Sequence, residues 1–132
     1  QTILPKLNSD FLEILLACCD EKLDEIEIKW HDKKSLCVVL CSKGYPDKFK
    51  KNVLIKNLNI IKLNKDEYCY HASTTKIEEK VYATGGRVLN FVCLSKDLSK
   101  ARVWIFNLIK SLNWSGGFFS KDIGYKVIGK WE

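Results

Sequence analysis

Apolar residues in the first part of the chain recur at the spacing of a helix. The apolar positions are Phe11, Leu12, Leu15, Leu16, Cys19 and Leu23. Asp10 and Glu13 have the spacing of a capping box, so we expect a helix from about residue 10 to about Leu23. One face of that helix is apolar and needs a surface to bury against. Nothing N-terminal to it remains in the chain to supply that surface.

The period of the pattern changes to two from Ile26 onward. Apolar and polar residues alternate over residues 26–30, and residues 35–41 form an apolar run. The charged residues 31–34 between them indicate a turn, so the pattern predicts a β-hairpin. Further short strands are expected at residues 53–55, 59–63, 67–71, 81–83 and 88–94, with a hydroxyl-rich loop after His71.

A second amphipathic helix is predicted near the end of the chain. Asp97 is a suitable N-terminal cap, and an apolar stripe follows over residues 98–112 at helical spacing. Arg102, Asn107 and Lys110 lie off that stripe. A helix, then many short strands, then a helix indicates an α+β fold with a mainly antiparallel sheet.

The stretch Gly85-Gly86-Arg87 is the strongest candidate for chemistry. Two glycines permit a tight turn or the close approach of the backbone to another surface. The arginine that follows offers a planar fork suited to carboxylate or phosphate. Two interpretations stay open: a hairpin turn between the strands at 81–83 and 88–94 with a surface arginine, or an anion site.

The composition is that of a packed domain. Apolar residues make up 46% of the 132 residues and aromatic residues 11%, so we expect one domain, or one domain plus a piece of another. No apolar run is long enough to span a membrane, and the start does not have the pattern of a signal peptide. The chain holds no methionine, from which we expect that its natural start is missing and that it is a piece of a longer protein.

Charge and cysteine content leave several classes of partner open. The formal net charge is +6 and the pI about 9.0, which suits nucleic acid, an anionic small substrate or simple solubility. The lysines concentrate only at residues 47–51, with no arginine-rich or RNP-like motif beside them, so a solvated loop is expected there. The six cysteines do not form a zinc-binding pattern. They are expected to be small buried hydrophobes in a reducing cytoplasm.

The two histidines differ in their surroundings. His31 lies in a charged turn and is expected to be exposed. His71 ends a predicted strand, where it is either a hydrogen-bonded structural histidine or part of a polar ligand site. No P-loop, GxSxG elbow or HExxH motif is present. This chain alone is therefore not expected to contain a complete active site.

Four segments, in order, resemble the C-terminal end of the phosphoribosylamine–glycine ligase family, also called glycinamide ribonucleotide synthetases. They are Gly44-Tyr45-Pro46, His71-Ala72 followed by Thr75-Lys76, Thr84-Gly85-Gly86-Arg87-Val88-Leu89, and Lys121-Asp122-Ile123-Gly124-Tyr125. Residues 4–10 also resemble the stretch after the family signature Arg-Phe-Gly-Asp-Pro-Glu-x-Gln, of which Gln1 would be the last residue. The resemblance extends over essentially the whole chain.

The resemblance implies a cytoplasmic ATP-grasp ligase of purine biosynthesis that joins glycine to 5-phosphoribosylamine. ATP and magnesium or manganese would bind upstream of Gln1, so no catalytic or metal-binding residue is expected in this chain. Residues 1–24 would be the last helix of the ATP-grasp domain, and residues 25–132 a C-terminal substrate-cleft domain similar to a barrel-sandwich hybrid. The piece alone would lack ligase activity, and its helix at residues 10–23 could pair two copies.

The same resemblance gives the candidate anion site a substrate. The residues implied to bind phosphoribosylamine are Gly85, Gly86, Arg87, His71, Thr75 and Lys76. Glycine amides and a guanidinium suit its dianionic phosphate. The family pattern is one residue shorter between the histidine and the lysine, so either Thr74 or Thr75 matches its threonine. The family also has glycine where Asn52 and Asn57 stand, and asparagine tolerates the left-handed backbone that such turns need.

Two other functions stay open from the sequence. A stand-alone basic module could bind RNA or another anion, whereas the ligase interpretation implies small-molecule substrates and neither nucleic acid nor membrane. A structural interaction domain would bind a protein. An open reading frame that continues upstream into a Gly-rich ATP-binding region would favour the ligase over both.

Overall fold

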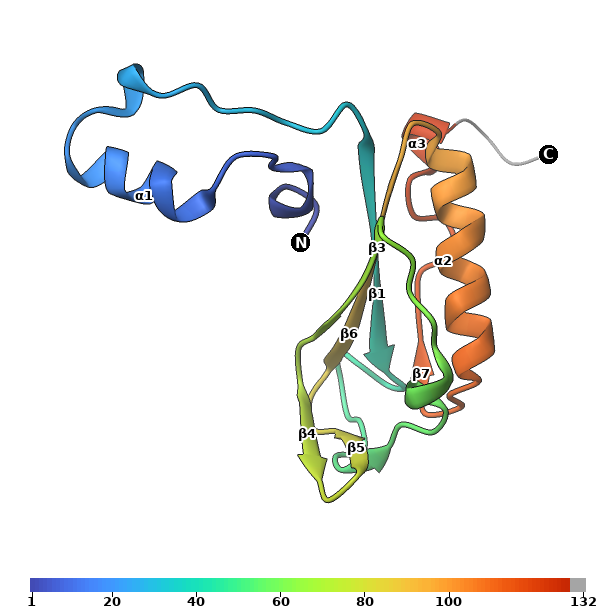
Figure 1. Cartoon of the computed structure of the whole chain (residues 1–132). Coiled ribbons are helices and arrows are strands. Elements are labelled where there is room, and N and C mark those ends of the chain that lie inside the picture. Colours follow the sequence, from blue (N-terminus) through green and yellow to red (C-terminus); the bar gives the residue numbers. More distant parts are fainter. Residues whose placement is uncertain (129–132) are drawn as a thin grey trace.

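The computed structural model describes residues 1–128, which form two antiparallel sheets with one long helix packed against the larger sheet (Figure 1). The strands are β1 (Lys34–Ser42), β2 (Val53–Leu54), β3 (Glu67–His71), β4 (Thr74–Ile77), β5 (Lys80–Ala83), β6 (Arg87–Ser95) and β7 (Gly117–Phe118). The helices are α1 (Phe11–Cys19), α2 (Leu98–Leu112) and α3 (Tyr125–Ile128), with 3-10 turns at Leu4–Lys6, Leu23–Glu25 and Leu58–Ile60. The predicted α+β class with mainly antiparallel sheets is confirmed.

The core lies between α2 and the larger sheet, whose strand order is β3-β6-β1-β7. Every second residue of β1 is buried, because successive side chains of a strand point to opposite faces. The core residues on β1, β6 and α2 include Leu36, Val38, Leu40, Leu89, Phe91, Ile105, Ile109 and Leu112. The strands predicted at 35–41, 67–71 and 88–94 are confirmed, and β6 pairs antiparallel with both β1 and β3.

The smaller sheet has the strand order β2-β5-β4, and Gly85-Gly86 connects it to the larger one. The hairpin interpretation of these glycines is wrong. β5 pairs with β2 and β4, whereas β6 pairs with β1 and β3. The two glycines therefore carry the chain from one sheet to the other.

Helix α2 is covered on two sides. Asp97 caps its start as the sequence predicts, and its carboxylate accepts hydrogen bonds from two amides of the first turn. The expectation that Arg102 lies off the buried surface is wrong, because this residue is only 3% exposed. Its guanidinium donates to the Lys121 carbonyl oxygen and lies 4.9 Å from the centre of the Phe106 ring. The residues after α2, 113–128, which we call the C-terminal segment, thus cover the flank of α2 that carries Arg102 and Phe106.

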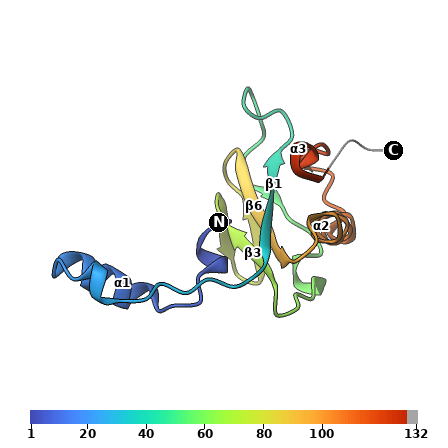
Figure 2. The ribbon, with the colours of Figure 1, turned by 90° about the horizontal axis from the view of Figure 1, so that it is seen from above.

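An N-terminal arm carries α1 away from the sheets, and both views of the ribbon show it extending to one side (Figures 1 and 2). Residues 26–30 are not the predicted strand and make no hairpin with residues 35–41. They run beside the start of the chain instead, where the Asn8 amide donates to the Lys29 carbonyl oxygen at 2.9 Å. Alternation predicts an extended segment here but does not specify its partner.

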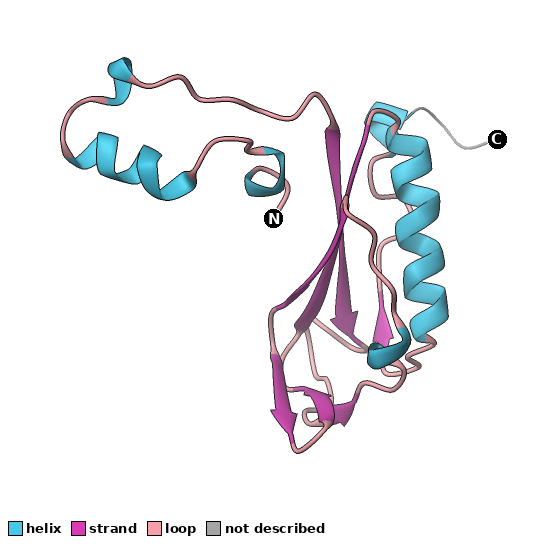
Figure 3. Cartoon of the chain, viewed as in Figure 1, coloured by secondary structure: helices cyan, strands magenta, loops and turns pink. Residues whose placement is uncertain are grey.

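Three local predictions need correction (Figure 3). Asp10 caps α1 as expected, but the helix ends at Cys19, short of its predicted end. Glu21 adopts a φ of +58°, a conformation that does not continue a right-handed helix. Residues 59–63 form part of a 3-10 turn and a loop instead of a strand, and residues 74–77, expected to be loop, form β4.

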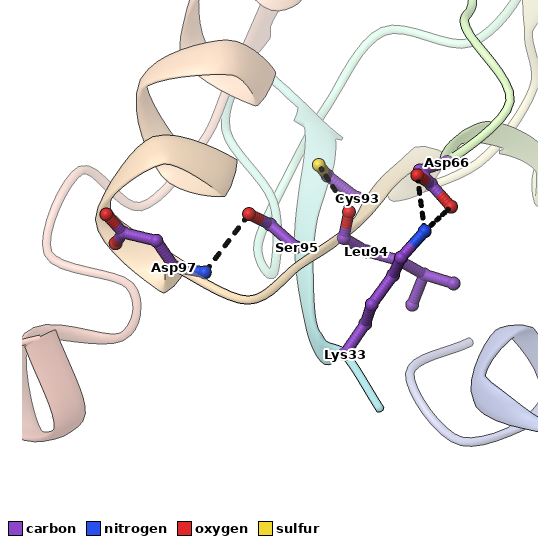
Figure 4. Close-up of polar contacts among 6 residues, drawn as sticks. All are labelled: Lys33, Asp66, Cys93, Leu94, Ser95 and Asp97. Carbon is purple, nitrogen blue, oxygen red and sulfur yellow. Dashed lines mark hydrogen bonds and ion pairs between the residues drawn. The ribbon is translucent and has the colours of Figure 1, made fainter. Parts of the chain in front are cut away.

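Polar contacts fix one end of the larger sheet, near the start of α2 (Figure 4). Lys33 Nζ lies 2.7 Å from both carboxylate oxygens of Asp66, which ties the residue before β1 to the loop before β3. The Asp97 amide donates to Ser95 Oγ at 3.1 Å. That bond turns the chain from the end of β6 into α2.

The cysteines are all free thiols, and their burial differs. Cys93 is buried in the core as expected. Cys18 and Cys19 are exposed, so the expectation of buried cysteines is wrong for this pair, because α1 stands on the arm and only Ala17 of that helix is buried. His31 is exposed, as predicted.

Candidate functional site

The Gly85-Gly86 turn is held by β1 and packs closely against two side chains. Ser42 Oγ donates to the Gly85 carbonyl oxygen at 2.7 Å, and the Ser42 amide donates to the Gly86 carbonyl oxygen at 2.8 Å. A Cβ at Gly86 would lie 2.0 Å from the Tyr45 ring, and one at Gly85 would lie 2.5 Å from Ser73 Oγ. Close approach requires these glycines, since neither has a positive φ. Within residues 1–128, no backbone carbonyl accepts a hydrogen bond from their amides.

Arg87 follows the turn as the first residue of β6, and its side chain is exposed. Its partner across the sheet is Cys41 of β1. Burial raises the pKa of the Cys41 thiol, and the positive charge of Arg87 opposes that rise. An exposed guanidinium beside two amides of a glycine turn is a suitable arrangement for an anionic oxygen.

A cleft of about 690 Å³ opens at the smaller sheet and includes two of the predicted site residues. His71 Nδ1 lies 2.8 Å from Thr74 Oγ1, and Lys76 Nζ forms an ion pair with Glu79 at 3.2 Å. We call it the histidine cleft, and its polar lining includes Lys56, His71, Thr74, Lys76, Glu79 and Lys80.

The residues that the sequence singles out fall into two neighbouring groups. The two glycines and the arginine form the turn, whereas His71 and Lys76 line the histidine cleft. Thr75 lies in β4 and is not part of the cleft lining. The groups are linked because the Ser73 amide donates to the Arg87 carbonyl oxygen at 3.0 Å. The structure thus brings the turn and the cleft near each other without placing all six residues in one pocket.

Sequence reasoning misses Thr74, Lys56 and Lys80, which all line the histidine cleft. The hydroxyl-rich loop after His71 contains a signal for Thr74, because the sequence leaves open which threonine matches the family pattern. The two lysines have no such signal. They reach the cleft only because β2 pairs with β5 and β5 with β4.

Apart from the Glu79 carboxylate, which pairs with Lys76, the charged groups of the described site are cationic, which suits an anionic ligand. Within residues 1–128, no three His, Cys, Asp or Glu side chains are grouped so that they could hold a metal ion. In the same part of the chain, each helix is too short or too polar to cross a membrane.

Comparison with known protein families decides where this fold belongs. The model of the family described as phosphoribosylglycinamide synthetase, C domain, matches residues 35–126. The chain belongs to this family. The match begins within β1 and runs through both sheets and α2, so it contains the glycine turn and the histidine cleft and leaves the N-terminal arm outside.

Curated relatives extend the similarity over nearly the whole chain. A phosphoribosylamine–glycine ligase from Caldanaerobacter subterraneus is 38% identical over 93% of this chain. A chloroplastic one from Arabidopsis thaliana is 36% identical over 97%, and one from Vibrio vulnificus is 35% identical over 98%. The chain spans 29%, 24% and 30% of the length of these three relatives.

A solved structure shows the same fold. The crystal structure of a phosphoribosylamine–glycine ligase from Thermotoga maritima superposes with a TM-score of 0.66 at 21% sequence identity. The superposition covers 93% of this chain and 29% of that one. The family resemblance found in the sequence is therefore confirmed by the family model and the curated relatives, and the fold by the solved structure.

Proposed function

We propose that the intact protein to which this chain belongs is a phosphoribosylamine–glycine ligase that uses ATP to join glycine to 5-phosphoribosylamine. The products are glycinamide ribonucleotide, ADP and phosphate. The observation that carries this proposal is the family match over residues 35–126, together with relatives of that name that cover more than nine-tenths of the chain. The six free thiols fit a reducing cytoplasm as its compartment.

In this proposal the chain supplies part of the substrate cleft and not the ATP chemistry. ATP and its metal, magnesium or manganese, belong to the rest of the ligase, as the family resemblance implies. Residues 25–132 form the C-terminal domain, and residues 1–24 end the ATP-grasp domain. Support for that boundary comes from α1, where Leu12 and Leu16 are 64% and 56% exposed on a helix that stands away from the sheets (Figure 1).

The exposed face of α1 also gives the isolated chain a means to self-associate. Its apolar side chains would otherwise contact water. In the intact ligase they pack on the ATP-grasp domain, whereas in the 132-residue chain two copies pair through this helix. Sedimentation of the chain with Leu12→Glu and Leu16→Glu tests this, since the paired form should be lost.

The glycine turn binds the phosphate of 5-phosphoribosylamine. The amides of Gly85 and Gly86 and the Arg87 guanidinium supply the donors, and the histidine cleft holds the neighbouring part of the substrate through His71 and Lys76. The exposed side chain of Arg87 and the lack of a backbone acceptor for the two amides within residues 1–128 support this assignment. Thr74, which contacts His71 at 2.8 Å, fits this role better than Thr75.

Arg87→Ala in the intact ligase tests the phosphate site. Loss of a charged hydrogen bond should raise the KM for phosphoribosylamine on the order of 10-fold, and the KM for ATP should stay within about twofold. Lys65→Ala is the matched control, because Lys65 lies outside both the turn and the histidine cleft. Equal shifts in both KM values, or none, would assign Arg87 a structural role. Absence of ATP- and glycine-dependent activity in the unmodified protein would overturn the ligase itself.

A further inference from the structure

A second cleft, of about 1070 Å³, adjoins the histidine cleft and shares Leu54, Lys56 and Asn57 with it. It reaches the loop that follows β1 and the residues that follow α2. Figure 2 shows the loop projecting beyond the end of β1. We call this the lysine cleft, and the residues that characterise it are Lys43, Lys48, Phe49, Lys50, Lys56 and Trp114.

The charge of the lysine cleft is one-sided. Its four lysines are exposed, and no Asp or Glu is part of the lining. The ion pairs of the described residues engage other lysines and none of these four. Four ammonium groups around one concave surface create a positive potential that attracts a polyanion.

One wall of the lysine cleft is an indole in a fixed orientation. Trp114 Nε1 donates to the Leu54 carbonyl oxygen at 3.0 Å. A Cβ at Gly116 would lie 2.8 Å from the indole, and one at Gly117 would lie 2.5 Å from it, so the ring packs directly against these glycines. Phe49 adds a second aromatic ring to the cleft. A planar ligand therefore meets a preorganised aromatic wall beside the lysines.

The loop that carries three of the lysines has a defined conformation. Gly44 adopts a φ of +99°, and a Cβ there would lie 2.3 Å from the Lys48 carbonyl oxygen. The Lys43 amide donates to the Gly116 carbonyl oxygen at 2.8 Å, which ties the loop to the turn that follows α2. The sequence suggests only a solvated loop at residues 47–51, whereas the fold places Lys48 and Lys50 in the same cleft as Trp114.

We propose that the lysine cleft binds a nucleotide, with its base against Trp114 and Phe49 and its phosphates among Lys43, Lys48 and Lys50. The volume is that of a small-molecule site. Single-stranded nucleic acid needs a groove several nucleotides long with successive aromatic platforms, and this cleft offers one aromatic corner. The site adjoins the phosphoribosylamine site proposed above, and Lys56 lines both clefts.

Titration of the full 132-residue chain with ADP, followed residue by residue by NMR, tests the proposal. We expect shifts at residues 43–50 and 113–116, and binding that weakens as salt is raised. Pyrophosphate and adenosine are the comparison probes, and each should bind at least 10-fold more weakly than ADP. Pyrophosphate that binds as tightly as ADP would overturn the role of the aromatic wall, and shifts confined to residues 71–80 would overturn the location.

Two matched double variants separate a specific site from general attraction to a basic protein. Lys48→Ala with Lys50→Ala should weaken ADP binding by about 10-fold or more, because two phosphate partners are lost. Lys65→Ala with Lys100→Ala removes the same charge from a different cavity and should change the affinity for ADP by less than twofold. Equal losses in the two double variants would overturn the proposal. Lys56 is left unchanged because it lines both clefts.

Discussion

At the scale of single residues, backbone geometry explains several unusual side-chain choices. Asn52 and Asn57 stand where the family has glycine, and both adopt the left-handed conformation, with φ of +56° and +63°. The expectation that asparagine preserves these turns is confirmed. Asn57 also donates through Nδ2 to the Leu112 carbonyl oxygen at 3.2 Å, so its side chain stabilises the end of α2.

Gly86→Ala should destabilise the fold, because its methyl group would lie 2.0 Å from the Tyr45 ring. We expect a loss of about 1–3 kcal/mol in the free energy of unfolding, measured by urea denaturation. The same change in a Tyr45→Ala background should cost clearly less, since the obstructing ring is gone. A loss of equal size in both backgrounds would contradict the steric explanation.

The thiols of Cys93, which is buried, and Cys69, which is half-buried, should react slowly with iodoacetamide. The ordinary pKa of a cysteine thiol is 9.0, and burial raises that of Cys69 to about 11. The pKa of Cys93 is also raised to about 11, mainly by burial and further by the negative charge of Glu67. At pH 8 their thiolate fraction is then about 100-fold below that of an unperturbed thiol. Mass spectrometry should find the exposed Cys18 and Cys19 alkylated first, and urea should abolish the difference.

The same pKa shifts determine how the stability of the fold changes with pH. Because the folded state holds these protons more tightly than the unfolded state, the contribution of the neutral thiols to stability is complete below pH 9. It is lost as the pH rises from 9 toward 11. Cys69→Ala should therefore make the urea midpoint less sensitive to pH in this window.

At the scale of elements, local sequence signals determine where α2 forms, and tertiary contacts determine which of its sides are buried. The Asp97 cap and the apolar stripe belong to the helix itself, and both follow from its own sequence. The second covered side, where Arg102 is buried, depends on the C-terminal segment. That segment is held by the contact between the rings of Phe106 and Phe119, whose centres are 5.1 Å apart.

Asp97→Ala should cost about 1 kcal/mol of stability, because two amides of the first turn of α2 lose their acceptor. Asp97→Ser should retain most of it, since serine is also a good cap. Thermal unfolding of the two variants measures the difference. Equal destabilisation by alanine and serine would mean that the carboxylate acts through its charge and not as a cap.

At the scale of the whole molecule, the chain consists of one packed body and an arm. The packed body comprises both sheets, α2 and the C-terminal segment, and its core members are almost fully buried. The arm carries α1, whose apolar face is exposed. An arm of this kind contributes little to the stability of the body, but it presents the surface that we assign to the rest of the ligase.

Leu112→Ala and Leu12→Ala make the same chemical change in the body and on the arm. Leu112 is 0% exposed, and its truncation should cost about 2–5 kcal/mol. Leu12 is 64% exposed, and its truncation should change the free energy of unfolding by less than about 0.5 kcal/mol. Similar losses in the two variants, at a concentration where sedimentation finds the chain monomeric, would mean that α1 packs on the body in solution.

How much the sequence determines differs between the fold and the candidate site. For the fold, periodicity and capping residues suffice for α2, β1, β3 and β6, because these signals act over one or two turns or along one strand. For the site, the family motifs single out the glycine turn and His71. The sequence does not predict that Lys56 and Lys80 line the histidine cleft, because no local pattern around an exposed lysine indicates which distant residues lie near it.

The sequence by itself determined the class of the fold, the long helix with its cap and the family resemblance. Each of these depends on neighbouring residues or on short motifs. Only the tertiary structure decided that Gly85-Gly86 links two sheets, that Arg102 is buried and that residues 26–30 pair with the start of the chain. It also placed the lysines of the loop after β1 in one cleft with Trp114. The physical reason is that strand partners and the covering of a helix face are set by packing between distant segments, which alternation along the chain does not encode.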